Sequence, residues 1–201
     1  MNPMIRVGME YLGAGADVHR QLVDYYNWHC VPLVDPARRY DMKLTDNWCA
    51  MFLSVLAHKA GLSRGDFPYE VSVYYQVEAA KDRGQYSKNI DSIRVGDLVV
   101  YDWTGRGTFN HVGIVSNVSN SSLDVLEGNY NRTVGVRTVR RTSKAINGFI
   151  ALNSGVVPTD KSRLEALVMA TMRGEFGNGM ERKVSLGSDY GEVQRIINTL
   201  I

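Results

Sequence analysis

The chain has 201 residues, and its 23 basic and 21 acidic side chains leave a formal net charge of +2. This near balance argues against nucleic acid or an anionic membrane as the main partner. No apolar stretch approaches the ~20 residues that cross a bilayer, and the N-terminal segment, with Arg6 and Glu10, lacks the apolar run of a signal peptide. The length suits one large domain, or a catalytic domain joined to a small module.

Two cysteines, Cys30 and Cys49, are too few for a disulfide framework, and both are expected to be reduced when the chain is made. Zinc needs three or four ligands, and Cys30, Cys49 and His111 are the only plausible set that the sequence offers. We therefore predict no metal and no cofactor.

The first part of the chain has helical periodicity. Apolar residues at helical spacing predict helix over 3–28, and two prolines mark 29–46 as an irregular connection. The segment DNWCAMFLSVLAHKAGL (46–62) predicts a helix that begins near Cys49. It should end at Gly61, where glycine commonly follows a helix.

From residue 95 to residue 152 the period changes to that of strands. Five short β-branched and apolar runs, separated by Gly, Asn, Ser and Thr, predict five antiparallel strands. These runs are VGDLVVYDW (95–103), HVGIVSNV (111–118), LDVLEGNY (123–130), VGVRTVRR (134–141) and INGFIAL (146–152). Helices that lead into a meander of strands predict an α+β fold over residues 1–152.

The remaining residues have the composition of a linker (153–162) followed by a three-helix module (163–201). The last helix is expected to begin at Asp189, which precedes Glu192 at capping-box spacing. A module of about forty residues is near the lower limit for independent folding. A DNA-binding module is disfavoured, because residues 160–201 hold six acidic and six basic side chains and no basic face.

Cys49 lies where a predicted helix begins. Unpaired backbone N–H groups and the helix dipole favour negative charge there, which lowers the pKa of a thiol and favours the nucleophilic thiolate. The alternative is a small buried hydrophobic residue, a common role for free cysteine. Position alone does not decide between the two, so a partner base is the deciding feature.

Of the four histidines, His111 is the best candidate for that base. His19 and His29 lie in or after the N-terminal helices without an implied polar partner. His58 follows Cys49 by nine residues, which is about 14 Å along a helix. His111 opens a predicted strand directly after the glycine-rich loop TGRGTFN, and such junctions present catalytic groups on a rigid scaffold.

An acceptor for the imidazole N–H follows on the next predicted strand. If the turn is centred on Ser119, Glu127 lies opposite His111, whereas a register shifted by two residues puts Asn129 there. Either side chain can accept the N–H and fix the tautomer. The alternatives are a solvated strand end for Glu127 and a turn residue for Asn129. Together with Cys49, these residues favour a catalytic triad.

These motifs together resemble a CHAP domain, a papain-like cysteine amidase or peptidase of bacterial cell walls that is common in phage endolysins. The resemblance rests on YDMKLTDNWCAMFLSVLAHKAGL, GDLVVYDW, NHVGIVSNV, VLEGNYN and INGFIAL, within residues 1–152. It implies that Cys49 is the nucleophile and His111 the general base. It also implies that Glu127 is the orienting acid and Asn129 an auxiliary polar group.

The chain departs from that family in two places. Some members carry a calcium-binding aspartate cluster before the cysteine, but this chain has only Asp41 and Asp46, and we do not predict calcium. Some place a glutamine directly before the cysteine to help bind the oxyanion. Here that position is Trp48, which we count among the substrate-contacting residues. The backbone N–H of Cys49 can still donate, and Asn47 is a weak candidate for the second donor.

The tail resembles a second family, the three-helix wall-binding repeat of phage lysozymes known as the CW-seven type. The matching positions here are Gly174, Gly177, Asn178, Gly179, Arg182, Leu186, Tyr190, Val193, Gln194 and Asn198. Members of that family bind muropeptide. The resemblance implies that Arg182 pairs with a carboxylate and that Gly187 and Ser188 reach sugar hydroxyls. The alternative is that Asn178 and Gly179 shape a turn and that Arg182 is an ordinary surface residue.

The sequence thus predicts a peptidoglycan hydrolase that cleaves a wall amide bond by Cys–His–Glu catalysis. A phage endolysin is expected, with either N-acetylmuramoyl-L-alanine amidase or peptidoglycan endopeptidase activity. The alternatives are a tail-associated or cellular wall hydrolase, and a non-catalytic wall-binding protein.

The expected partner is peptidoglycan muropeptide, without nucleic acid or membrane insertion. Synthesis in a host cytoplasm without a signal peptide, followed by release to the wall, is the expected route. Because the tail repeat often occurs in tandem in its family, a homo-oligomer is a further expectation.

Overall fold

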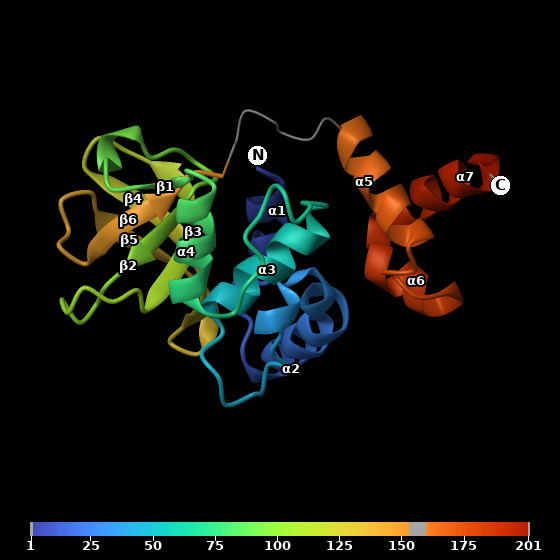
Figure 1. Cartoon of the computed structure of the whole chain (residues 1–201), viewed down its shortest axis with the longest axis horizontal. Helices are drawn as coiled ribbons and strands as arrows, with labels where there is room; N and C mark the ends of the chain where they lie inside the picture. The colour runs from blue at the N-terminus through green and yellow to red at the C-terminus, as the bar shows by residue number, and fades with distance from the viewer. Residues whose placement is uncertain (1, 153–159, 201) are drawn as a thin grey trace.

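The computed structural model describes residues 2–152 and 160–200 and has the α+β architecture expected from the sequence (Figure 1). The strands in these residues are β1 Tyr86–Ser87, β2 Leu98–Tyr101, β3 His111–Val118, β4 Ser122–Tyr130, β5 Thr133–Arg140 and β6 Ile146–Ile150. They form an antiparallel sheet in the order β1-β6-β2-β3-β4-β5. Five are the predicted strands, and β1 is an additional two-residue edge strand.

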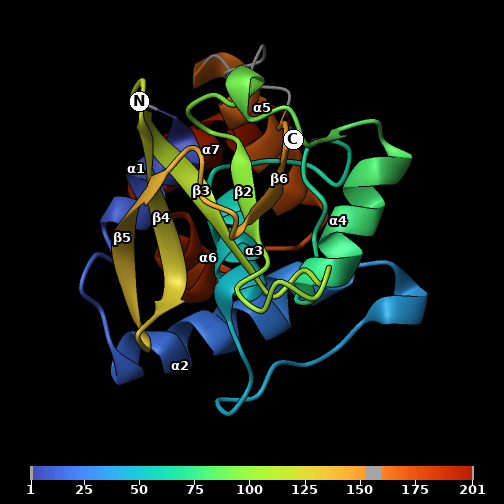
Figure 2. The ribbon, with the colours of Figure 1, turned by 90° about the vertical axis from the view of Figure 1, so that its left-hand side faces the viewer.

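The longer helices of the first part of the chain pack on one face of this sheet, whereas Ile90 in the last short helix packs against the apolar cluster on the other face. The helices of this part are α1 Pro3–Met9, α2 Ala16–Tyr25, η1 Tyr26–Cys30, η2 Val31–Leu33, η3 Pro36–Arg38, α3 Cys49–Lys59, α4 Val73–Asp82 and η4 Ile90–Ser92. The predicted helical zone 3–28 is therefore two helices, and η1, a π-helix, continues α2. Figure 2 shows the sheet in front of α2 and α3, with α4 beside it.

The helix α3 is the centre of this arrangement. Ten of its eleven residues are buried, because α1, α2 and η1 cover one side of it and the sheet covers the other. Burying a side chain such as Phe52 or Leu53 contributes roughly 1.5–3 kcal/mol. The helix ends as predicted: Gly61 has a φ of 78°, and the N–H of Leu62 donates to the carbonyl of Ala57 at 2.9 Å.

Apolar clusters cover both faces of the sheet. Val112 and Ile114 of β3 point toward α3 and its neighbours, whereas Val115 points to the opposite face with Val99 and Val125. All four residues of β2 are buried, as expected for a central strand that is covered on both sides. The sequence does not signal α4, because its buried residues include Gln76 among a few small apolar side chains.

The C-terminal residues form the three expected helices, α5 Asp160–Met172, α6 Gly179–Leu186 and α7 Tyr190–Leu200, with the short η5 Gly187–Asp189 between the last two. They enclose their own apolar cluster, which includes Leu167, Phe176 and Val193. Residues 153–159 of the predicted linker lie outside the described residues. No helix in the described part of the chain is long and apolar enough to cross a membrane.

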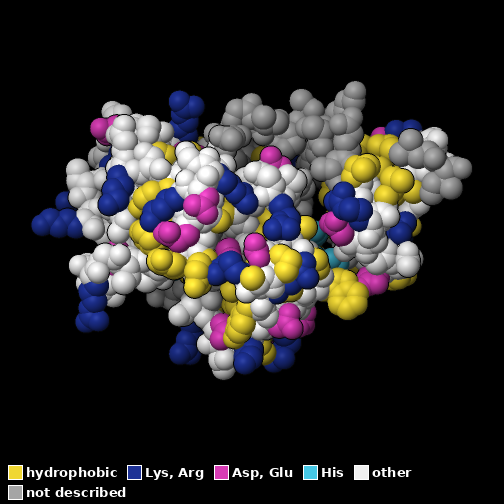
Figure 3. Space-filling view, in the orientation of Figure 1, with side chains coloured by type: hydrophobic (Ala, Val, Ile, Leu, Met, Phe, Trp, Pro, Cys, Tyr) yellow, Lys and Arg dark blue, Asp and Glu magenta, His cyan; other side chains and the backbone are white. Residues whose placement is uncertain are grey.

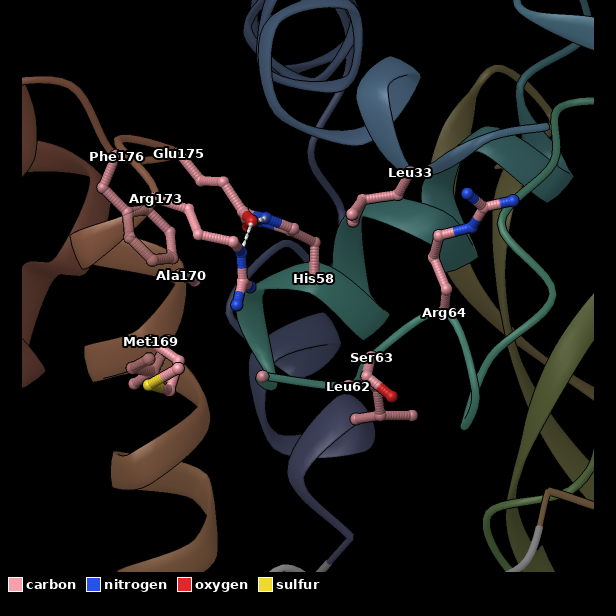
Figure 4. A pocket seen from close by; sticks show the side chains of 12 residues that line it. Leu33, His58, Leu62, Ser63, Arg64, Met169, Ala170, Arg173, Glu175 and Phe176 are labelled. Carbon is pink, nitrogen blue, oxygen red and sulfur yellow. Dashed lines mark hydrogen bonds and ion pairs between the residues drawn. The ribbon is translucent and has the colours of Figure 1, made fainter. Parts of the chain in front are cut away.

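These C-terminal helices contact the end of α3 that is opposite Cys49. A cavity of about 350 Å³ lies between the two parts, with His58 on one side and Arg173, Glu175 and Phe176 on the other (Figure 4). The carboxylate of Glu175 lies 3.9 Å from Nε2 of His58, and the Phe176 ring lies 5.4 Å from the His58 ring. The helices α1–α3 are thus sandwiched between the sheet and the C-terminal helices (Figure 1).

A second histidine takes part in this contact. Nδ1 of His29 hydrogen-bonds the backbone carbonyl of Glu175 at 2.6 Å, and its ring stacks on that of His58. Burial lowers the pKa of His29 to about 4, helped by the charges of His58 and Lys59 and opposed by Glu175. The contact therefore selects the neutral form of His29.

Acidification from about pH 7 to about pH 4.5 is expected to loosen this contact. When the C-terminal helices are released, the His29 imidazole has its ordinary pKa near 6.5, so it is protonated at a pH at which the docked imidazole is still neutral. Acid therefore stabilises the released state, and docking weakens by roughly 1–2 kcal/mol as the pH falls through this range. Small-angle X-ray scattering across the range should report a larger radius of gyration at the acid end.

The matched control for that titration is His29→Gln, which keeps a donor for the carbonyl of Glu175 but does not titrate. Its radius of gyration should change less with pH than that of the wild type. A wild-type value that does not change, or an equal change in both proteins, would contradict the role given to His29.

Candidate active site

The site begins at the N-terminus of α3. Cys49 is the first residue of this helix and is 3% exposed, and Trp48 precedes it without a side-chain cap for the first N–H groups. These groups and the helix dipole are therefore free to stabilise negative charge at this end. The backbone of β4 comes close here, since a methyl group on Gly128 would lie 2.5 Å from Cβ of Phe52.

His111 and Glu127 meet beside this helix start. His111 is the first residue of β3, and its Nε2 lies 3.0 Å from Oε2 of Glu127, whose side chain is fully buried. Cys49 lies close enough to the same imidazole to raise its pKa. Because Nε2 is bonded to the carboxylate, Nδ1 is the ring nitrogen left for the thiol. The structure therefore brings the three predicted residues together, with a hydrogen bond between His111 and Glu127 and with Cys49 beside the imidazole.

The strand register that brings Glu127 to His111 is the second of the two that the sequence allowed. Ile114 pairs with Leu126, so the register is the one shifted by two residues, and Glu127 stands opposite Gly113 instead of His111. The carboxylate reaches His111 diagonally along the face. Glycine permits this, since a methyl group at residue 113 would lie 2.7 Å from Cγ of Glu127.

The groups around His111 favour the charged form of its imidazole. Burial alone would lower the pKa of His111, but the hydrogen bonds and charges of Cys49 and Glu127 outweigh it and raise the pKa to about 9. An imidazolium beside a thiol favours the thiolate, which is the nucleophilic form. The site therefore holds a charged imidazole beside Cys49 at neutral pH.

Arg137 on β5 holds the outer side of Glu127, and the sequence analysis did not identify it. Its Nε lies 3.0 Å from both carboxylate oxygens. Its guanidinium lies 4.8 Å from the ring centroid of Trp103 and 4.8 Å from that of Tyr130. Tyr101 stacks between Trp103 and His111, so one continuous stack supports the imidazole and the arginine.

The carboxylate of Asp102 holds the glycine-rich loop before His111 in place, and the sequence analysis did not identify this residue either. Its carboxylate accepts hydrogen bonds from Thr104, Gly105, Gly107, Thr108 and Asn110. These bonds lower its pKa to about 2, with the Thr104 hydroxyl as the largest cause. The sequence signal was an aspartate at the start of a loop rich in Gly and Thr, which is typical of turn-forming side chains.

Asn129 lies in the position opposite His111 but bonds elsewhere. It has a positive φ of 59°, and its Nδ2 donates to Oδ1 of Asn47 at 3.2 Å. The Asn47 carboxamide, two residues before Cys49, is therefore oriented with its own N–H₂ group away from this bond. The arrangement makes Asn47 available as a donor at the start of α3.

Trp48 and Cys30 are both part of the core. The Trp48 side chain is 3% exposed and stacks on the His19 ring at 4.6 Å, which favours a role in holding the start of α3 over direct substrate contact. Cys30 is buried, donates to the carbonyl of Ser54, and has a pKa raised well above its ordinary value by burial. It has the character of an unreactive thiol.

The predicted wall-binding residues are linked to one another in the C-terminal helices. Arg182 donates to the carbonyl of Gly177 and to the side chains of Asn178 and Gln194, each at 3.1 Å. Gln194 in turn donates to Asn198 at 2.8 Å. The guanidinium therefore braces the start of α6 against α7, with two of its five N–H groups left over.

The glycines of this region allow backbone conformations with positive φ. Gly179 and Gly187 have positive φ values of 55° and 53°, at the two ends of α6. Such values favour glycine. Ser188 lies in η5, and its side chain is outside the described residues.

A cysteine at a helix start, a histidine on the neighbouring sheet and a buried carboxylate define a papain-like cysteine hydrolase. Residues 22–129 match the CHAP domain model, and residues 165–201 match the model of the CW_7 repeat. The first match covers more than half of the chain, so the chain belongs to the CHAP family. No curated protein and no solved structure matches it.

These matches confirm the two resemblances predicted from the sequence. CHAP domains are cysteine- and histidine-dependent peptidoglycan hydrolases, and the CW_7 repeat binds the cell wall. The chain is thus a peptidoglycan hydrolase with a wall-binding repeat at its C-terminal end.

Replacing Glu127 with glutamine is expected to move the alkaline limb of the pH–rate profile. In the role that the sequence predicts for it, His111 must stay protonated to donate to a leaving amine, and its pKa of about 9 depends partly on the Glu127 carboxylate. Loss of the Glu127 carboxylate should move the alkaline limb of the pH–rate profile down by about one pH unit and lower kcat roughly 10–100-fold. The measurement is kcat/KM against pH, with Glu10→Gln as an exposed control; an unmoved limb would refute the coupling.

Gly113→Ala is expected to displace the Glu127 side chain although it replaces no ionisable residue. The added methyl would meet Glu127 and Val125 at under 3 Å, so the carboxylate must move away from His111. We expect kcat/KM to fall roughly 10–100-fold and stability to fall by about 1–3 kcal/mol. Gly191→Ala is the control, because nothing lies within 4 Å of its added methyl. Wild-type kinetics in Gly113→Ala would show that the diagonal contact is dispensable.

Proposed function

We propose that the protein cleaves an amide bond in the peptide part of peptidoglycan, with Cys49 as nucleophile, His111 as general base and acid, and Glu127 as the orienting carboxylate. The observation that carries this proposal is the meeting, at the start of α3, of Cys49 with an imidazole that is hydrogen-bonded to a fully buried carboxylate. Such an arrangement can supply both the thiolate and the proton that acyl transfer requires.

The proposed reaction has two halves. The thiolate of Cys49 attacks the amide carbon, and His111 gives its proton to the leaving amine as the carbon–nitrogen bond breaks. Water then attacks the acyl-enzyme, with His111 accepting its proton and the Cys49 sulfur leaving. The backbone N–H of Cys49 and the Asn47 carboxamide are the proposed donors to the oxyanion in both halves.

The proposed organisation is a catalytic unit of residues 1–152, a linker (153–162) and a wall-binding unit of residues 163–201. The separate apolar cluster within α5–α7 supports the division. In the second unit, Asn178, Gly179, Arg182, Gly187 and Ser188 are the proposed contacts to muropeptide. Tethering raises the local concentration of substrate at Cys49.

The biological role that suits this pairing is that of a phage endolysin that reaches the wall after release from the host cytoplasm. The amide bond is either that between muramic acid and alanine or one within the stem or cross-bridge. A catalytic unit that is paired with a wall-binding unit supports a lytic role.

Digestion of purified peptidoglycan tests the proposed reaction. The wild type should release soluble fragments, and Cys49→Ala should lower the rate at least ~10³-fold, because a methyl group cannot form the acyl-enzyme. Mass spectrometry of the products identifies the bond: stem peptides freed from intact glycan indicate an amidase, and new amino groups within stems indicate an endopeptidase. Equal release by the Cys49→Ala variant would overturn the proposal.

A further inference from the structure

A second cavity, of about 470 Å³, lies beside the triad on the outer side of Arg137. Trp103 forms one wall, the end of β5 forms another, and Thr142 and Ser143 of the following turn complete it. Because Arg137 also binds Glu127, a single side chain separates this cavity from the catalytic carboxylate. Arg137 therefore joins the cavity to the pair of His111 and Glu127.

The lining of this cavity is positively charged. Arg137 and Arg140 both line it, and no acidic side chain among the described residues does. Residues 132–144 hold five cations and no acidic residue, although the whole chain has a net charge of only +2. Figure 3 shows Lys and Arg side chains projecting from the end of the molecule where β5 and β6 are labelled in Figure 1.

Donors in the cavity are free to bind a ligand. Arg137 uses Nε for Glu127, and within the described residues its two terminal nitrogens have no hydrogen-bond partner. The Arg140 side chain likewise has no hydrogen bond or ion pair to any described residue, whereas the neighbouring Arg141 side chain pairs with Asp91 at 3.3 Å. Guanidinium groups match planar carboxylates through paired N–H donors.

The cavity also has an apolar platform. Trp103 is 46% exposed and is held from below by its stack on Tyr101 at 4.6 Å. The cation of Arg137 lies against the same indole, which keeps both side chains in place. A ligand with a carboxylate and an adjacent aliphatic or sugar face can satisfy both the arginines and the indole.

We propose that this cavity is a substrate subsite that binds a carboxylate of the peptidoglycan stem peptide, with Arg140 and the terminal nitrogens of Arg137 as donors and Trp103 as the platform. The inference rests on the proposed function, because a stem peptide reaches the cavity only when its amide lies at Cys49. The join to the triad through Arg137 favours a peptide carboxylate over the phosphates of a wall polymer.

Two synthetic muropeptides test the subsite: one has free stem carboxylates, and the other has the same carboxylates converted to amides. Wild-type kcat/KM should favour the free acid at least ~10-fold, the factor expected for a lost charge-assisted pair. Arg140→Gln should raise KM for the free acid roughly 10-fold and remove most of this preference. Arg20→Gln, an exposed change of the same charge on α2, should keep it.

Binding to the Cys49→Ala variant, measured by calorimetry, separates the subsite from catalysis. Tighter binding of the free acid than of the amide, lost when Arg140→Gln is added, supports the subsite even if neither peptide is cleaved. Failure of the wild type to cleave either peptide then counts against the proposed function alone.

Three results would overturn the subsite: equal kcat/KM and equal binding for the two peptides, a preference that survives in Arg140→Gln, or an Arg140-dependent affinity for a polyol-phosphate polymer that exceeds that for the peptide.

Discussion

The burial of one carboxylate organises the active site. Glu127 is completely inaccessible to solvent, and a buried charge of this kind is tolerated only when partners compensate for its lost hydration. His111 and Arg137 are those partners, one on each side. The pKa of His111, the position of the imidazole beside Cys49 and the ordered stack of Tyr101, Trp103 and Arg137 all follow from this compensation.

Glycine makes this arrangement possible at two points. Gly113 lets the Glu127 side chain run diagonally across the sheet to His111, and Gly128 lets β4 approach the first turn of α3. A side chain at either position would separate the carboxylate from the histidine or the strand from the helix. The catalytic geometry therefore depends on two residues that contribute no functional group.

Sequence patterns predicted the elements with strong periodicity and the chemistry that has a distinctive order along the chain. The five strands, the helix from Cys49 to Gly61 and the three C-terminal helices follow from apolar spacing, and Cys49, His111 and Glu127 follow from their positions at element ends. Register was harder, because Val118 pairs with Leu123, which places the turn between residues 120 and 121 instead of at Ser119, and a bulge between Val115 and Asn117 then shifts the pairing once more. The first register considered was therefore wrong, while the shifted alternative was right.

What the sequence did not reveal consists mostly of contacts between residues far apart in the chain. Arg137 lies in a run of arginines on a strand, and nothing local distinguishes it from a solvated cation until β4 and β5 are paired. The stacking of Trp48 on His19 was also not predicted, since it depends on the packing of α2 against α3. The helix α4 was overlooked because its buried face is short and partly polar.

The helix α3 sets a fixed distance between Cys49 and the C-terminal helices. Its first residue is Cys49, and His58 near its other end contacts these helices, so about 14 Å of helix separates the proposed nucleophile from the docked repeat. While the repeat stays docked, its proposed wall contacts and the bond proposed to be cut at Cys49 are held at separate points of the peptidoglycan mesh.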